Sequence, residues 1–160
     1  TPITGSQIAL GVYIAALGRT FVTVVIYWLI LLIADALPTG TAWLAMFVAM
    51  LAGGAFGSIM LYLTSKVEKE DFFLTAIGRL IIMPLFLFSG TFYPLTNMPI
   101  FLQWIGWISP LWHATELGRW LTYGSEISTP MLFLHFIFLN SILIFGVIAS
   151  RRIFTKRLGK

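Results

Sequence analysis

The chain contains no cysteine, only two histidines, and few charged residues, which make up 10% of the sequence. Without cysteine it has no disulfide, no thiolate metal site and no thiol nucleophile. The two histidines lie 22 positions apart, which is weak support for a metal site. The sequence also lacks GxxxxGK[ST], and its serines lie outside a GxSxG context. We therefore assign no catalytic, cofactor-binding or metal-binding residue.

Hydrophobic residues make up 59% of the chain, and its mean hydropathy is +0.94. A soluble domain of this length cannot bury so much apolar surface, so we expect the chain to lie in a membrane. The net charge of +4 is not a sign of nucleic-acid binding, because half of the basic residues follow the last apolar run. Such a tail is typical of a cytoplasmic end. These residues are Arg151, Arg152, Lys156, Arg157 and Lys160.

Apolar runs predict four membrane-spanning helices in a single transmembrane domain, residues 1–160. We expect a helix that begins near Gln7, capped by Ser6, with its first turns at the membrane surface and Arg19 at the aqueous boundary. The first residue is Thr1, which we interpret as the start of a fragment whose upstream part is missing. The four spans are residues 17–37, 41–65, 72–92 and 131–150.

The third span is interrupted at Gly90 and Pro94, and the apolar stretch that follows is too short to cross a bilayer. If this stretch crossed, the basic tail at 151–160 would lie on the opposite side from Lys66. We therefore predict an all-α integral membrane protein with four spans and a short re-entrant or interfacial hairpin, residues 98–123. The hairpin would lie on the extracellular side and the tail in the cytoplasm.

Several polar and aromatic residues in the hairpin are candidates for function. Glu116 and Arg119 can pair on one helical face, and His113 would extend the same stripe. They form either a polar rim at the outer mouth or a local salt bridge, and we favour the salt bridge. The crowded indoles form either an anchoring aromatic belt, the default, or a surface on which a ligand stacks. These are Trp104, Trp107, Trp112 and Trp120.

Two further features concern the spans themselves. Gly53 and Gly57 form a GxxxG pattern, which favours close helix packing inside the bundle or at a dimer seam. Arg79 is expected to extend to the cytoplasmic headgroups, and Asp35 to reach water at the outer end of its span.

Two segments carry a family resemblance: LFSGTFYPLTNMP, and LQWIGWISPLWHATELGR after it. With GGAFG in the second span and the basic tail, they resemble the type-2 ABC transporter permeases, in particular the drug- and lipo-oligosaccharide-export branch. The resemblance covers nearly all 160 residues. It implies a plasma-membrane permease with six helices per subunit, of which this chain would hold the last four.

The resemblance also implies partners and site residues. A second permease subunit and a separate cytoplasmic ATPase, which holds ATP and Mg²⁺, would complete the exporter, so this chain is not itself an enzyme. The segment Pro2–Ala15, including Ile3 and Gln7, would transmit force from the ATPase. The substrate pathway or outer gate would involve Gly90, Tyr93, Pro94, Trp112, His113, Glu116 and Arg119.

We expect the walls of the substrate cavity to come from the first, second and third spans. Their apolar character and scarce buried charge favour an amphipathic drug or a lipid-linked oligosaccharide as the exported substrate. The alternatives are a secondary carrier driven by an ion gradient and a membrane subunit with no transport role. A carrier would often place charged residues near mid-span, and no acidic residue lies there. The residues do not determine the substrate, the direction of transport, or whether the permease is a homodimer or a heterodimer.

Overall fold

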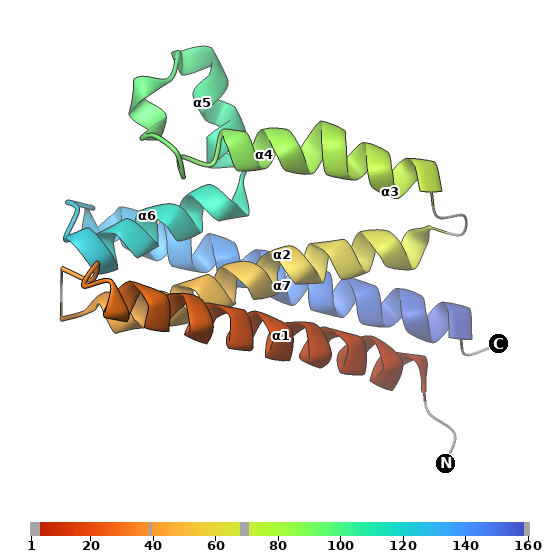
Figure 1. Cartoon of the computed structure of the whole chain (residues 1–160). Coiled ribbons are helices and arrows are strands. Elements are labelled where there is room, and N and C mark those ends of the chain that lie inside the picture. The colour runs from red at the N-terminus through yellow and green to blue at the C-terminus, as the bar shows by residue number, and fades with distance from the viewer. Residues whose placement is uncertain (1–3, 39, 68–70, 159–160) are drawn as a thin grey trace.

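The computed structural model describes residues 4–38, 40–67 and 71–158. These residues form helices and connecting loops, without a β-strand in the described ranges. Three helices are long and apolar enough to cross a membrane: α1 (Gly5–Ile33), α2 (Ala45–Lys66) and α7 (Thr129–Leu158). Figure 1 shows them packed side by side along their length. The chain is thus an all-α integral membrane protein, as the sequence predicts.

α1 begins earlier than the sequence analysis expected. Its N-cap is Thr4, not Ser6, because Thr4 and Gln7 form a capping box. The side-chain oxygen of each residue accepts a hydrogen bond from the backbone N–H of the other. From Gly5 the helix runs unbroken to Ile33, so Arg19 lies near its middle and not at a helix boundary. After the helix Asp35 is exposed and has a φ of 51°, in the left-handed region that Asp adopts more readily than most residues.

The third apolar segment is shorter and is built from three pieces. α3 (Asp71–Ile77), the π-helical turn η2 (Gly78–Ile82) and α4 (Met83–Leu87) follow one another without a break. Pro84 lacks the N–H that would bond the carbonyl of the preceding turn, and a π-helical turn accommodates this loss. Arg79 is exposed in η2, near the α3 end.

A helical hairpin follows α4. After the short 3-10 turn η3 (Leu95–Asn97) come α5 (Ile100–Trp107) and α6 (Pro110–Tyr123). Pro110 begins α6 with a residue whose φ suits a first turn, and Gly124 ends it in the left-handed conformation. α5 has only 8 residues, so it is far too short to span a bilayer. The segment is a hairpin, as predicted.

The elements define two ends of the molecule. The start of α1, the start of α3 and the last turns of α2 and α7 lie at one end, which we call the tail end (Figure 1). α6 and the start of α7 lie at the other, the hairpin end. At the tail end Arg157 donates hydrogen bonds to the carbonyls of Lys66 (2.8 Å) and Val67 (3.3 Å), where α2 ends. A cation there complements the partial negative charge of the helix C-terminus.

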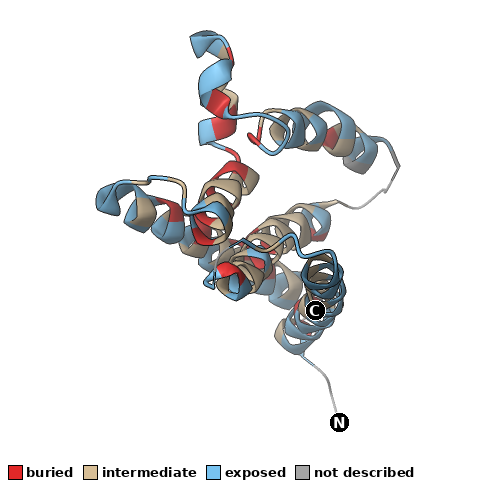
Figure 2. Ribbon diagram, turned by 60° about the vertical axis from the view of Figure 1, so that its left-hand side comes forward, coloured by how far each residue is buried: buried red, intermediate tan, exposed pale blue. Residues whose placement is uncertain are grey.

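The closest packing is between α2 and α7. Ser58 is fully buried and donates to the carbonyl of Ala55 at 2.8 Å and to that of Ile142, on α7, at 3.3 Å. A Cβ added to Gly146 would lie 2.3 Å from the Ser58 hydroxyl oxygen, so only glycine fits there. Most of the buried residues in the described ranges lie on such faces or at the hairpin junction (Figure 2).

The two predicted packing glycines differ. A Cβ on Gly53 would meet the methyl group of Thr20 on α1 at 2.7 Å, so Gly53 lies at a close helix contact. A Cβ on Gly57 would meet nothing within 4 Å among the described residues. A packing role for Gly57 inside this bundle is therefore absent in the described chain, while the dimer seam stays a prediction. Gly54, which is offset by one from the GxxxG pattern, packs against Tyr13, whose hydroxyl donates to the Gly54 carbonyl at 3.0 Å.

Candidate functional site: the hairpin and the cavity beside it

Hydrogen bonds from Arg119 on α6 and from Ser109, the residue just before α6, join the hairpin to α4 and to the loop that follows it. The Arg119 guanidinium donates to the carbonyl oxygen of Gly90 and, at 3.1 Å, to the Glu116 carboxylate. The buried Ser109 hydroxyl donates to the carbonyl of Leu85 at 3.1 Å. The predicted Glu116–Arg119 salt bridge is confirmed, and its arginine also reaches the loop after the third segment. A movement of α4 would therefore be transmitted to α6.

Gly90 lies at the centre of this junction. Its φ is +76°, which an L-residue adopts only with strain, and a Cβ there would lie 3.1 Å from the Trp112 ring. The bend after α4 thus needs glycine for its backbone and for its packing. Trp112 is buried against Leu95 and Met98, so it serves as packing at the junction. Its indole N–H is buried without a hydrogen-bond partner.

His113 does not belong to the stripe that the sequence predicted. It is 2% exposed, and its Nδ1 lies 2.7 Å from Nδ1 of His135 on α7. Its ring stacks on Phe138 at 3.9 Å, with Trp112 at its edge. The prediction was wrong because α7 packs against the side of α6 that carries His113 and buries its ring, while Glu116 stays half-buried and pairs with Arg119.

The hydrogen bonds fix the tautomers of both neutral rings. His113 Nε2 lies 2.9 Å from the Trp107 carbonyl, which can only accept, so Nε2 carries the hydrogen. In a neutral ring, Nδ1 of His113 must then accept, and Nδ1 of His135 donates to it. Burial lowers the pKa of His113 to about 4 and outweighs the raising effect of the Trp107 carbonyl; His135 nearby lowers it further. The rings therefore form a neutral tie between α6 and α7, and their Nδ1 atoms bond each other and do not surround an ion.

Tyr93 and Pro94, which were also predicted at the gate, lie on the surface of the protein. Tyr93 is 40% exposed, and Pro94 is exposed at the start of η3. Neither is drawn into the contacts that join α4 to α6. Thr91 is closer to that junction, since its hydroxyl lies 3.4 Å from that of Thr115 on α6.

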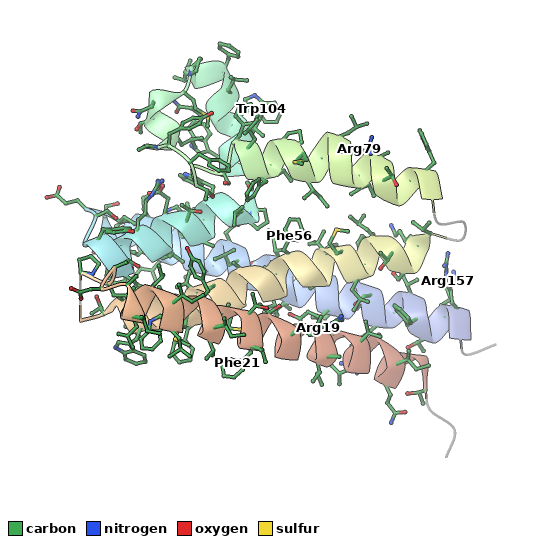
Figure 3. All side chains as sticks on the ribbon, viewed as in Figure 1. Arg19, Phe21, Phe56, Arg79, Trp104 and Arg157 are labelled. Atoms are coloured by element: carbon green, nitrogen blue, oxygen red, sulfur yellow. The ribbon has the colours of Figure 1, made fainter. Side chains whose placement is uncertain are left out.

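An apolar cavity of about 700 Å³ lies between α2, the η2–α4 segment and α6. The sequence analysis expected cavity walls from the first three spans, but α6 replaces α1 in this cavity. Figure 3 labels Phe56 on the α2 side. Phe86 lies on the α4 side, and most of the other lining residues are small or aliphatic, including Ala49, Ala52, Gly53, Leu85, Ala114 and Gly118. The cavity can hold apolar groups and offers them almost no polar partner.

Of the predicted coupling residues, Gln7 is described by the structure and lies at the tail end. Pro2 and Ile3 lie outside the described residues. Gln7 is exposed, and its side chain is engaged in the capping box with Thr4. Nearby, Arg151 of α7 donates to the Ser6 hydroxyl at 3.2 Å, which brings the first turn of α1 level with the start of the basic tail.

Sequence reasoning missed three residues that the structure makes important. His135 and Ser109 join elements distant in the sequence, and no local pattern marks such pairing. The third is Arg19, which was predicted at the aqueous boundary and which lies about halfway along a helix that runs from Gly5 to Ile33.

Comparison with known proteins identifies relatives of this chain. The family model described as "ABC-2 type transporter" matches residues 1–123. Nodulation protein J of Rhizobium leguminosarum bv. viciae is 30% identical over 96 residues, which cover 58% of this chain and 37% of that protein. Nodulation protein J of R. leguminosarum bv. trifolii is 32% identical over 118 residues, 74% of this chain and 38% of that protein. The matched chain thus spans less than two fifths of each relative. No solved structure matches significantly.

Proposed function

The chain belongs to the ABC-2 type transporter permease family, and from that premise we propose that it serves an ATP-driven exporter. Permeases of this family are membrane transport components of ABC transporters and are not ATPases. In this proposal a separate subunit binds ATP and Mg²⁺, and a second permease subunit completes the pathway. The absence of a phosphate-binding loop from the sequence agrees with that division of labour.

We place the tail end in the cytoplasm and the hairpin at the outer face of the plasma membrane. The charge distribution supports this orientation, because cations gather at the tail end and cytoplasmic ends of membrane helices are enriched in Lys and Arg. The described cations there are Lys66, Arg151, Arg152, Lys156 and Arg157.

In this proposal the hairpin is the outer gate, and one observation carries it. The hairpin is joined both to the end of α4, through Arg119 and Gly90, and to α7, through His113 and His135. Force that enters at the tail end, through the start of α1, and moves the spans would therefore displace the hairpin. ATP binding would drive that motion by closing the ATPase subunits below the tail end.

The cargo is an amphipathic molecule, such as a drug or a lipid-linked oligosaccharide. The cavity between α2, α4 and α6 supports this class because its lining is apolar and its volume, about 700 Å³, lies within the range of small-molecule sites. A hydrophilic ion would find no coordinating oxygen cluster in such walls.

A reversible lock on the hairpin tests the proposal. These 160 residues contain no cysteine, so a Thr91→Cys/Thr115→Cys pair can be oxidised selectively once cysteines elsewhere in the complex are replaced by serine; the native hydroxyl oxygens are 3.4 Å apart. In the complex with its ATPase, reconstituted in lipid vesicles, we expect oxidation to slow ATP hydrolysis and reduction to restore it. Each single-cysteine variant is the control. An unchanged ATPase rate after complete cross-linking would refute the hairpin as a coupled gate.

A further inference from the structure

Arg19 lies about halfway along α1, with apolar residues on both sides of it in the helix (Figure 3). It is exposed, and its guanidinium makes no hydrogen bond or ion pair with any other residue in the described ranges. Its backbone carbonyl accepts a hydrogen bond from the Thr23 hydroxyl at 3.0 Å. A cation in the middle of a spanning helix is costly and is by default a candidate functional site.

Contacts between helices show how deep Arg19 lies. Arg151, the first cation after the apolar part of α7, bonds Ser6 and so marks the membrane boundary on α1. Arg19 is 13 residues further along, which corresponds to about 20 Å of helix. Because the hydrocarbon core is about 30 Å thick, Arg19 lies well inside it, out of reach of the headgroups at the tail end. Its neighbour Thr20 contacts Gly53, itself near the middle of α2, which gives the same depth.

Arg79 provides a contrast. It lies 8 residues from the start of α3, or about 12 Å of helix, so its side chain can extend to the headgroups. The Arg19 side chain is too far along its helix to reach those headgroups.

No acidic side chain that the structure describes lies near that depth. Asp35 follows α1 at the hairpin end, Glu116 is paired on α6, and Glu126 precedes α7. A second copy of the chain does not change this result. Two subunits related by an axis along the membrane normal keep every residue at its own depth. The residues of the partner copy at the depth of Arg19 are therefore the same ones, and no described acidic side chain is among them.

We propose that Arg19 faces a water-accessible transport pathway and binds an anionic group of the exported substrate. This inference rests on the proposed transport function and refines the substrate class to an amphiphile that carries a phosphate, sulfate or carboxylate. The planar guanidinium can bind two oxygens of such a group at once. The Thr23 hydroxyl lies one turn away on the same face, and aliphatic residues such as Ile26 flank it for the apolar part.

Water access can be measured with single cysteines in the otherwise cysteine-free chain. Phe21 is the matched control, because it lies at nearly the same depth and about 200° around the helix from Arg19. In the full-length permease–ATPase complex in vesicles, a charged, water-soluble thiol reagent should label Arg19→Cys at least about tenfold faster than Phe21→Cys, since burial in lipid suppresses the reactive thiolate. Equal, slow labelling at both positions would overturn the proposal.

Anion binding needs a second measurement, with dodecyl phosphate as the probe and neutral dodecyl maltoside as its control. We expect dodecyl phosphate to protect Thr23→Cys from the reagent, and Arg19→Gln to weaken that protection about tenfold, the worth of a charge-assisted hydrogen bond. Arg79→Gln should leave it unchanged. Equal protection with and without the Arg19 guanidinium would refute anion binding by this residue. If hairpin cross-linking controls ATP hydrolysis but Arg19 fails these tests, the proposed function stands and this inference falls.

Discussion

The Arg119 guanidinium donates a hydrogen bond to the carbonyl oxygen of Gly90, a residue that precedes it by 29 positions. The bond crosses from the middle of the hairpin's second helix to the bend that ends the third apolar segment. It satisfies a buried carbonyl with a charged donor, while the Glu116 carboxylate holds the other arm of the guanidinium. The position of α6 is thus tied directly to the position of α4.

Replacing Arg119 tests the strength of this tie. Arg119→Gln should lower the free energy of unfolding by about 1.5–3 kcal/mol, because the Gly90 carbonyl loses a charged donor. Glu116→Gln is the control, since it keeps the bond to Gly90 and removes only a half-exposed ion pair worth about 0.5 kcal/mol. Thermal unfolding of the two variants in lipid nanodiscs compares them. Equal losses would mean that the Gly90 bond contributes little.

Gly90 should be harder to replace than Gly124, the other described glycine with a positive φ. Gly90→Ala pays the left-handed backbone cost of about 1–2 kcal/mol and also pushes a methyl group against the Trp112 ring. Gly124 separates the two effects, because its φ is +66° and a Cβ there meets nothing within 4 Å. Gly124→Ala should therefore destabilise the chain less than Gly90→Ala in the same unfolding assay. The reverse order would contradict the packing at Trp112.

Gly146 should be essential for the contact between α2 and α7. Gly146→Ala would place a methyl group 2.7 Å from the Ser58 backbone carbon, so the helices must separate, at a cost of about 1–3 kcal/mol. Gly57→Ala is the matched control on α2, where the space is open and better helix propensity should leave stability unchanged or slightly higher. Denaturation of the isolated subunit measures both. If Gly57→Ala preserves that stability but weakens subunit association on size-exclusion chromatography, the dimer-seam interpretation of Gly57 gains support.

The parts of the fold that follow from local chemistry could be predicted from the sequence. Apolar runs predicted the three long helices and the third apolar segment, which is shorter in the structure than predicted. Gly90 and Pro94 marked the bend, and the length of residues 99–110 excluded a crossing. The Glu116–Arg119 pair also follows from helical spacing alone. Helix limits were less well predicted, because Ser6 and Thr4 are both good caps and only the Gln7 side chain selects Thr4.

Contacts between distant elements could not be predicted in this way. Nothing in the residues around His113 indicates that it meets His135, since the meeting depends on how α6 packs on α7. The walls of the described cavity were likewise not predictable, because only the fold shows that α6 lies opposite α4. The depth of Arg19 is a third such case, because the helix continues on both sides of it and only contacts with neighbouring helices indicate where it lies.

The histidine pair should behave as a coupled unit. His113→Phe leaves the Trp107 carbonyl and the His135 N–H without partners, and should cost about 1–3 kcal/mol. His135→Phe should cost a similar amount, but the double variant should cost less than the sum, because the pair is then removed together. Unfolding of all four members of the cycle in nanodiscs gives the coupling free energy. Additive losses would show that the two rings do not depend on each other.

Acid should loosen the hairpin, because burial lowers the pKa of His113 below that of an exposed histidine. The group binds its proton more readily in the unfolded chain, where its pKa is close to 6.5, than in the folded one, where it is about 4. Its stabilising contribution is therefore complete above pH 6.5 and declines as the pH falls towards 4, by up to about 1.4 kcal/mol per pH unit for one proton. Carboxylates titrate in the same range, so the measured quantity is the difference in unfolding free energy between the parent and His113→Phe at pH 7.5, 6, 5 and 4.5. That difference should shrink on acidification, and a difference independent of pH would place His113 in a setting that tolerates its charge.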